Sequence, residues 1–115
     1  MDIIVTIPRA RQAQVEAEEA EVARRLAAGE KGLAYFWCLG REPRELDVGD
    51  RVYFVWDGAV RAWHEVTGFG DDLTCDLTGI PYLGCCIVLA PEIHELRPVR
   101  HMPPFRGFRY TERIG

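Results

Sequence analysis

The residues best suited to chemistry lie on a stretch that alternates charged and aromatic side chains. Arg61, Trp63 and Glu65 occupy alternate positions, and alternate residues of an extended strand point to the same face. A Trp between an Arg and a Glu can stack on a flat ligand while the carboxylate accepts hydrogen bonds from the ligand's N–H groups. The alternative interpretation is a solvated strand face on which Arg61 and Glu65 are ordinary surface charges.

Four further residues are candidates for a site or for the core. Tyr35 and Trp37 share one face of the aromatic run at residues 33–39, so they fit either a core or the mouth of a pocket. His64 stands among apolar neighbours, and we interpret it as a core histidine rather than a base. Glu19 lies within an apolar helical stripe, either at the rim of the core or directed into a cleft between helix and sheet.

The C-terminal segment, residues 97–115, differs in charge from the rest of the chain. It holds five Arg and a single acidic residue, whereas the whole chain has a net charge of −4. Arg106 and Arg109 alternate with Phe and Tyr, a composition that suits base stacking and phosphate binding. The same composition suits a tail whose aromatic rings pack on the body. Together with Arg100, these two residues are the candidate phosphate-binding side chains, because an acidic body repels a polyanion everywhere else.

Other site chemistries are not indicated by the sequence. The four cysteines, at positions 38, 75, 85 and 86, lack zinc-site spacing, so we expect reduced thiols with no metal and no disulfide. No phosphate-binding glycine loop, HExxH motif or Ser–His–Asp order is present, so we expect no cofactor. No apolar run approaches the roughly 18 residues of a membrane helix. We therefore expect a cytoplasmic protein with no membrane partner.

The elements that must position these residues are mostly strands. Strands are predicted at residues 3–7, 33–39, 51–56, 59–66, 73–77 and 84–90. A helix is predicted over residues 10–28, and Asp57-Gly58 predicts a hairpin turn. Residues 68–72 are predicted to form a loop, and residues 91–96 a short turn or helix. The predicted core contains Val52, Phe54, Trp56, Val60, Ala62, Ile87 and Leu89. We expect one α+β domain over 1–115, a β-barrel of about five to seven mostly antiparallel strands with the helix packed on it.

Three segments also resemble a known group of proteins. These are Trp37–Arg41 (WCLGR), Leu46–Phe54 (LDVGDRVYF) and Ala62–Val66 (AWHEV), in the order strand, turn-and-strand, and returning strand. This arrangement resembles the PUA-like β-barrels, especially their ASCH and EVE branches, over most of residues 3–90. The resemblance implies a small pseudo-barrel with a cleft that receives RNA or a modified nucleobase.

The resemblance and the residues together predict a binding module for RNA or for a modified or flipped nucleobase. Trp37 and Trp63 would stack on the base, and Glu65 would accept hydrogen bonds from its edge. Arg61 and Tyr35 complete the predicted base-binding set, and nucleic acid is the expected partner.

Two alternatives remain open. One is a small amidohydrolase acting on a modified nucleoside, with Glu65 and either His64 or Lys31 in acid–base roles. The resemblance implies this activity because some small ASCH proteins are amidohydrolases that use a Lys, a Thr and a Glu. Here no Thr closely follows Lys31, so the sequence favours binding over catalysis. The other alternative is a structural or protein-binding domain with no nucleotide ligand.

Overall fold

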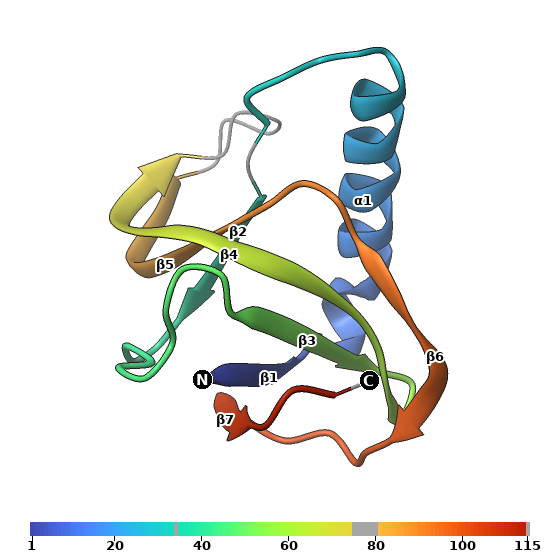
Figure 1. Ribbon diagram of the computed structural model, residues 1–115, viewed down its shortest axis with the longest axis vertical. Coiled ribbons are helices and arrows are strands. Elements are labelled where there is room, and N and C mark those ends of the chain that lie inside the picture. Colours follow the sequence, from blue (N-terminus) through green and yellow to red (C-terminus); the bar gives the residue numbers. More distant parts are fainter. Residues whose placement is uncertain (34, 75–80, 115) are drawn as a thin grey trace.

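A computed structural model describes residues 1–33, 35–74 and 81–114 of the chain (Figure 1). The described part is an α+β fold with one α-helix and a mixed sheet of seven strands. The elements are β1 (Asp2–Thr6), a 3-10 turn (Arg9–Arg11), α1 (Gln12–Ala27), β2 (Tyr35–Leu39), β3 (Arg51–Trp56), β4 (Ala59–Thr74), β5 (Pro81–Leu89), β6 (His94–His101) and β7 (Phe108–Thr111).

The sheet is organised around the long strand β4, which curves across the molecule (Figure 1). The strand order is β2-β5-β4-β3-β1-β7, and β6 pairs with β4 outside this path. The beginning of β4 is flanked by β3 on one edge and β6 on the other, while its later part pairs with β5. All of these pairs are antiparallel except β1 with β3, which run parallel.

The predicted barrel is not closed. In the described residues no ladder joins the end strands β2 and β7. The loop at residues 40–50 reaches β7 instead: the guanidinium carbon of Arg41 lies 4.6 Å from the centre of the Phe108 ring, and the Tyr110 hydroxyl accepts a 3.2 Å hydrogen bond from the Glu45 N–H. Side chains, rather than backbone hydrogen bonds, therefore connect the two ends of a curled but open sheet.

The hairpin between β3 and β4 confirms the predicted turn and corrects the predicted alternation. Asp57 and Gly58 have φ values of 49° and 70°, and type I′ turns need positive φ at both central residues. The register shifts after the Phe54–Ala62 pair, so Val60 lies opposite Val55. This bulge places Val60 on the sheet face opposite to Phe54, whereas strict alternation had placed both on one face.

Each face of the sheet has buried residues, which form a separate hydrophobic cluster on that face. All residues of the predicted core are buried except Trp56, which is half-buried. The inner cluster, on the side of α1, contains Ile3, Val5, Ile7, Val15, Tyr35, Trp37, Leu46, Val52, Phe54, Val66, Ile87, Leu89 and Phe108. The outer cluster contains Ile4, Tyr53, Val55, Val60, Leu96 and Ile114. The C-terminal segment is therefore part of the fold, because it contributes to both clusters.

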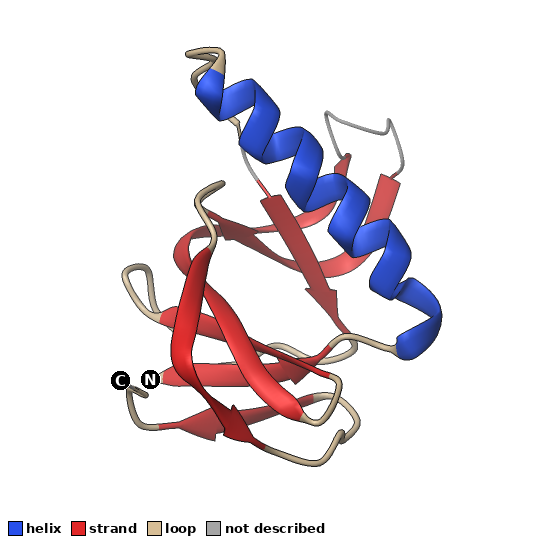
Figure 2. Cartoon of the chain, turned by 90° about the vertical axis from the view of Figure 1, so that its right-hand side faces the viewer, coloured by secondary structure: helices blue, strands red, loops and turns tan. Residues whose placement is uncertain are grey.

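The helix α1 lies along one side of the curled sheet (Figure 2). Val15 and Val22 are buried on its sheet-facing stripe, as the predicted periodicity requires. It ends before Gly29, whose φ of 82° suits the residue that terminates a helix. None of the described helices is long and apolar enough to cross a membrane.

Two predicted elements differ from the structure. Residues 68–72 are not a loop: β4 runs on to Thr74, with register shifts after Val66 and Asp71 that bend it around β5. Residues 91–96 form no helix, because β6 begins at His94 and pairs with β4, which buries Leu96. The predicted strand at 73–77 lies largely outside the described residues.

Candidate functional site

Trp63, the centre of the predicted platform, is stacked between two protein groups. The Arg51 guanidinium carbon lies 3.7 Å from the centre of its ring, and the His94 ring stacks on it at 4.1 Å and 17°. Arg51 comes from β3 and His94 from β6, which flank β4 on opposite edges. Both faces of the Trp63 ring are therefore covered by the protein's own side chains.

Trp37 and Tyr35 belong to the inner cluster and are buried. Trp37 meets the Phe54 ring edge-on at 5.1 Å, and the Arg11 guanidinium carbon lies 5.5 Å from its centre. Trp63 packs against the outer cluster. The sheet separates the two tryptophans, so the structure does not bring them together on one ligand.

Arg61 lies at the β-bulge and is directed toward the hairpin turn. Its Nε donates a 2.7 Å hydrogen bond to the carbonyl of Trp56, and Nη2 donates a 3.0 Å hydrogen bond to the carbonyl of Asp57. Glu65 is exposed, and its register partner on β3 is Arg51. The structure thus separates Arg61 from Glu65.

The three candidate phosphate-binding arginines are all exposed. Arg100 lies on β6 and Arg109 on β7, with the Arg109 guanidinium carbon 4.3 Å from the centre of the Phe105 ring. Arg106 lies just before β7. These residues do not line a pocket with any of the predicted base-binding residues among the described pockets.

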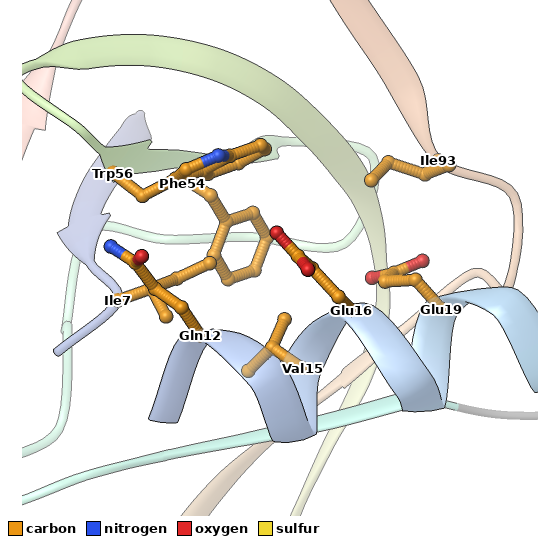
Figure 3. A pocket seen from close by; sticks show the side chains of 8 residues that line it. All are labelled: Ile7, Gln12, Val15, Glu16, Glu19, Phe54, Trp56 and Ile93. Atoms are coloured by element: carbon orange, nitrogen blue, oxygen red, sulfur yellow. The ribbon is translucent and has the colours of Figure 1, made fainter. Parts of the chain in front are cut away.

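The structure instead forms a pocket between α1 and β3 (Figure 3). Its volume is about 200 Å³, and it is lined by Ile7, Gln12, Val15, Glu16, Glu19, Phe54, Trp56 and Ile93. Phe54 and Trp56 form one wall, and α1 forms the other. The surface of the pocket is almost entirely apolar, so the few polar groups at its edge decide which ligand it orients.

The polar groups of the pocket come from one face of α1. Gln12, Glu16 and Glu19 are spaced four and three residues apart, which places them on one side of a helix. Figure 3 shows Glu16 rising from the helix toward the aromatic wall, and Glu19 rising farther along the helix on the side of Ile93. Neither Lys nor Arg lines this pocket among the described residues.

Glu19 is held at the pocket by a buried histidine on β4. His64 is 0% exposed, and its Nε2 lies 2.8 Å from Glu19 Oε1. The other ring nitrogen, Nδ1, lies 2.7 Å from the carbonyl oxygen of Ala90. Because a carbonyl only accepts hydrogen bonds, Nδ1 carries a hydrogen and donates it to Ala90. The prediction that His64 is a core residue is confirmed, and the structure adds the bond to Glu19.

Two aromatic rings further restrain this histidine. The Tyr35 ring stacks on it at 5.1 Å and 11°, and the Phe54 ring meets it edge-on at 5.7 Å. The Tyr35 hydroxyl also lies 3.5 Å from Glu18 Oε2 on α1. Contacts from β2, β3 and α1 thus hold the imidazole, and through it the Glu19 carboxyl, in one orientation.

No known family or structure matches the chain: family models, curated proteins and solved structures all give no match.

Most of this pocket was missed by reasoning from the sequence. Glu19 was recognised as a carboxylate that a cleft could use, but Trp56 was assigned to the core, and Glu16 and Gln12 were not singled out. Their spacing with Glu19 is a signal that the sequence contains. Ile93 has no such signal, because it lies in the connection before β6 and reaches the pocket only through the fold.

A second cluster of reactive groups lies on β2 and β5. Cys38 and Cys86 are register partners, with their sulfur atoms 2.6 Å apart. Burial and the hydrogen bond with Cys86 raise the pKa of the Cys38 thiol to about 12. The described residues include no group of three or more side chains placed to hold a metal ion.

Proposed function

We propose that the protein is a binding module for a modified or flipped nucleobase, and that the base enters the pocket between α1 and β3. The observation that carries this proposal is the combination of a small apolar slot, an aromatic wall and a row of hydrogen-bond acceptors. The resemblance of residues 3–90 to the PUA-like barrels, proposed from the sequence and matched by no family model, implies a ligand of the same class.

The size of the pocket suits one flat ring system. Pockets for drug-sized ligands have volumes of about 300–1,000 Å³, and this one is smaller, at about 200 Å³. Phe54 and Trp56 offer apolar ring surface to a base, and stacking of this kind tolerates any base. The carboxylates of Glu16 and Glu19 accept hydrogen bonds from the N–H groups along its edge.

Arg61 is the residue best placed to contact a phosphate attached to such a base. It lines a neighbouring depression that shares Trp56 and Ile93 with the pocket. Its guanidinium carbon lies 6.0 Å from the centre of the Trp56 ring. Two of its five N–H groups bind backbone carbonyls, which leaves others for a phosphate oxygen. This role differs from the base contact predicted for Arg61 from the sequence, and Arg100, Arg106 and Arg109 would contact phosphates farther along a strand.

The test is a panel of nucleosides and short single-stranded oligonucleotides measured by isothermal titration calorimetry. Trp56→Ala should weaken binding about 5- to 150-fold, because stacking on one aromatic ring contributes about 1–3 kcal/mol per base. Trp63→Ala is the matched control: it also removes a half-buried indole of the same hairpin, but outside the pocket. The affinity of Trp63→Ala should stay within about twofold of that of the wild-type protein. Circular dichroism of both variants shows whether they are folded.

Two results would overturn this proposal. Loss of affinity in Trp63→Ala, with the affinity of Trp56→Ala unchanged, would move the site to the strand face that carries Trp63 and Glu65. Absence of binding to every nucleoside and oligonucleotide would leave the structural or protein-binding alternative.

A further inference from the structure

The hydrogen bonds of His64 determine how many protons lie at the pocket wall. Nδ1 donates its hydrogen to the Ala90 carbonyl, so in a neutral ring Nε2 has only a lone pair. That lone pair would then face the Glu19 carboxylate at 2.8 Å, and two acceptors at this distance repel each other. The contact therefore contains one proton, held either by His64 or by Glu19.

The pair has the same net charge in both cases. If His64 holds the proton, its positive charge cancels the Glu19 carboxylate; if Glu19 holds it, both groups are neutral. Among the lining residues Glu16 is then the one that carries a charge, because Gln12 is neutral and the others are apolar. The cation Arg61 lies in the neighbouring depression, with its guanidinium carbon 6.0 Å from the centre of the Trp56 ring. In the described part of the chain Glu16 forms no ion pair.

We propose that the pocket prefers a flat organic monocation, such as a nucleobase methylated on a ring nitrogen, over a neutral base of the same size. This inference rests on the proposed function and specifies its ligand. A cationic ring stacked on Trp56 is attracted by the negative face of the indole. The Glu16 carboxylate adds a Coulomb attraction, weakened because this side chain is exposed to solvent.

Pairs of methylated nucleosides provide a direct test, since the two members of each pair differ in the position of one methyl group and, at neutral pH, by one proton and its charge. 1-Methyladenosine is a cation at neutral pH and N6-methyladenosine is neutral; 3-methylcytidine and 5-methylcytidine form a second such pair. Calorimetric titration at neutral pH and low salt should show the cation of each pair binding about three- to tenfold more tightly. Equal affinities within both pairs would overturn the inference and leave the proposed function intact. No binding of any of the four nucleosides, or of any other nucleoside, would overturn both.

Two substitutions of the same type separate charge from methyl position. Glu16→Gln removes the charged carboxylate of the pocket, so the preference for the cation should fall in both pairs to the part that the aromatic ring supplies. Glu19→Gln should retain the preference, because a Gln amide N–H can donate to neutral His64 and the pair stays uncharged. The opposite result, with the preference lost only in Glu19→Gln, would show that the proton is absent and that Glu19 carries the charge. Thermal melting of both variants shows whether each is folded.

Discussion

His64 connects three parts of the fold through a single side chain. It lies on β4, binds Glu19 on α1 and binds the backbone of Ala90 after β5. A buried polar group costs stability unless its hydrogen bonds are made, and here both ring nitrogens have partners. The same contacts therefore position the helix against the sheet and set the chemistry of the pocket wall.

Phe54 is the aromatic residue on which both the inner cluster and the pocket depend. It is 3% exposed and contacts the rings of Trp37 and His64. Phe54→Ala should lower the free energy of unfolding by about 3–5 kcal/mol, measured by urea denaturation. Phe69→Ala, at a side chain that is 44% exposed on β4, is the control and should cost less than about 1 kcal/mol. A loss below about 1 kcal/mol for Phe54→Ala would show that this residue is not in a packed core.

At the scale of elements, the pairing of β2 with β5 changes the reactivity of a thiol. Only the thiolate of a cysteine is alkylated, and its fraction rises about tenfold per pH unit below the pKa. Because the pKa of Cys38 is raised from 9.0 to about 12, alkylation by iodoacetamide should keep rising well above pH 9. In the urea-unfolded chain, the alkylation rate of Cys38 should instead stop rising once the pH exceeds the ordinary pKa of a thiol. Peptide mass spectrometry of protein kept under reductant measures both rates, and an early plateau in the folded protein would contradict the burial of this thiol.

The hairpin turn depends on a glycine at one position. Gly58 has φ of 70°, a conformation that costs a residue with a Cβ roughly 1–2 kcal/mol. Gly58→Ala should therefore lower the free energy of unfolding by about that amount in urea denaturation. Gly40→Ala is the matched control, because its Cβ would meet nothing within 4 Å and its φ is not positive. Equal effects of the two substitutions would show that the turn does not require the positive φ.

At the scale of the whole molecule, the C-terminal segment is bound to the sheet by a buried tyrosine. The Tyr53 hydroxyl donates to the carbonyl of Ile114 at 3.1 Å and accepts from its N–H at 3.0 Å. Tyr53 is 0% exposed, so the loss of its hydroxyl leaves the backbone groups of Ile114 without these partners. This contact joins β3 to a segment that is 61 residues away in the sequence.

Tyr53→Phe should accordingly lower the free energy of unfolding by about 1–3 kcal/mol, the cost of unpaired buried polar groups. Tyr110→Phe provides the control, since its hydroxyl accepts one hydrogen bond at the surface and its loss should cost less than about 1 kcal/mol. Thermal and urea unfolding measure both. If the two variants were equally stable, the C-terminal segment would not be held through Tyr53.

The sequence by itself determined several local elements, although not the second half of β4 or the start of β6. The Asp57-Gly58 turn, the helix that ends before Gly29 and the burial of Phe54, Ile87 and Leu89 all follow from patterns within a few residues. Such patterns are reliable because alternation and helical periodicity are set by backbone geometry. They also identified Glu19 as a polar residue within an apolar stripe, which is the part of the pocket that was visible in advance.

The tertiary structure alone decided which of these residues meet. The bulge at Arg61 shifts one strand by a residue without a marker in the sequence, so Val60 changes face. The sheet places Trp37 and Trp63 in different clusters, although their composition suggested one platform. His64 and Glu19 meet across 45 residues of sequence, and this contact depends on the packing of α1 against β4. Periodicity describes neighbours along the chain, whereas a pocket is formed by residues that only the fold brings together.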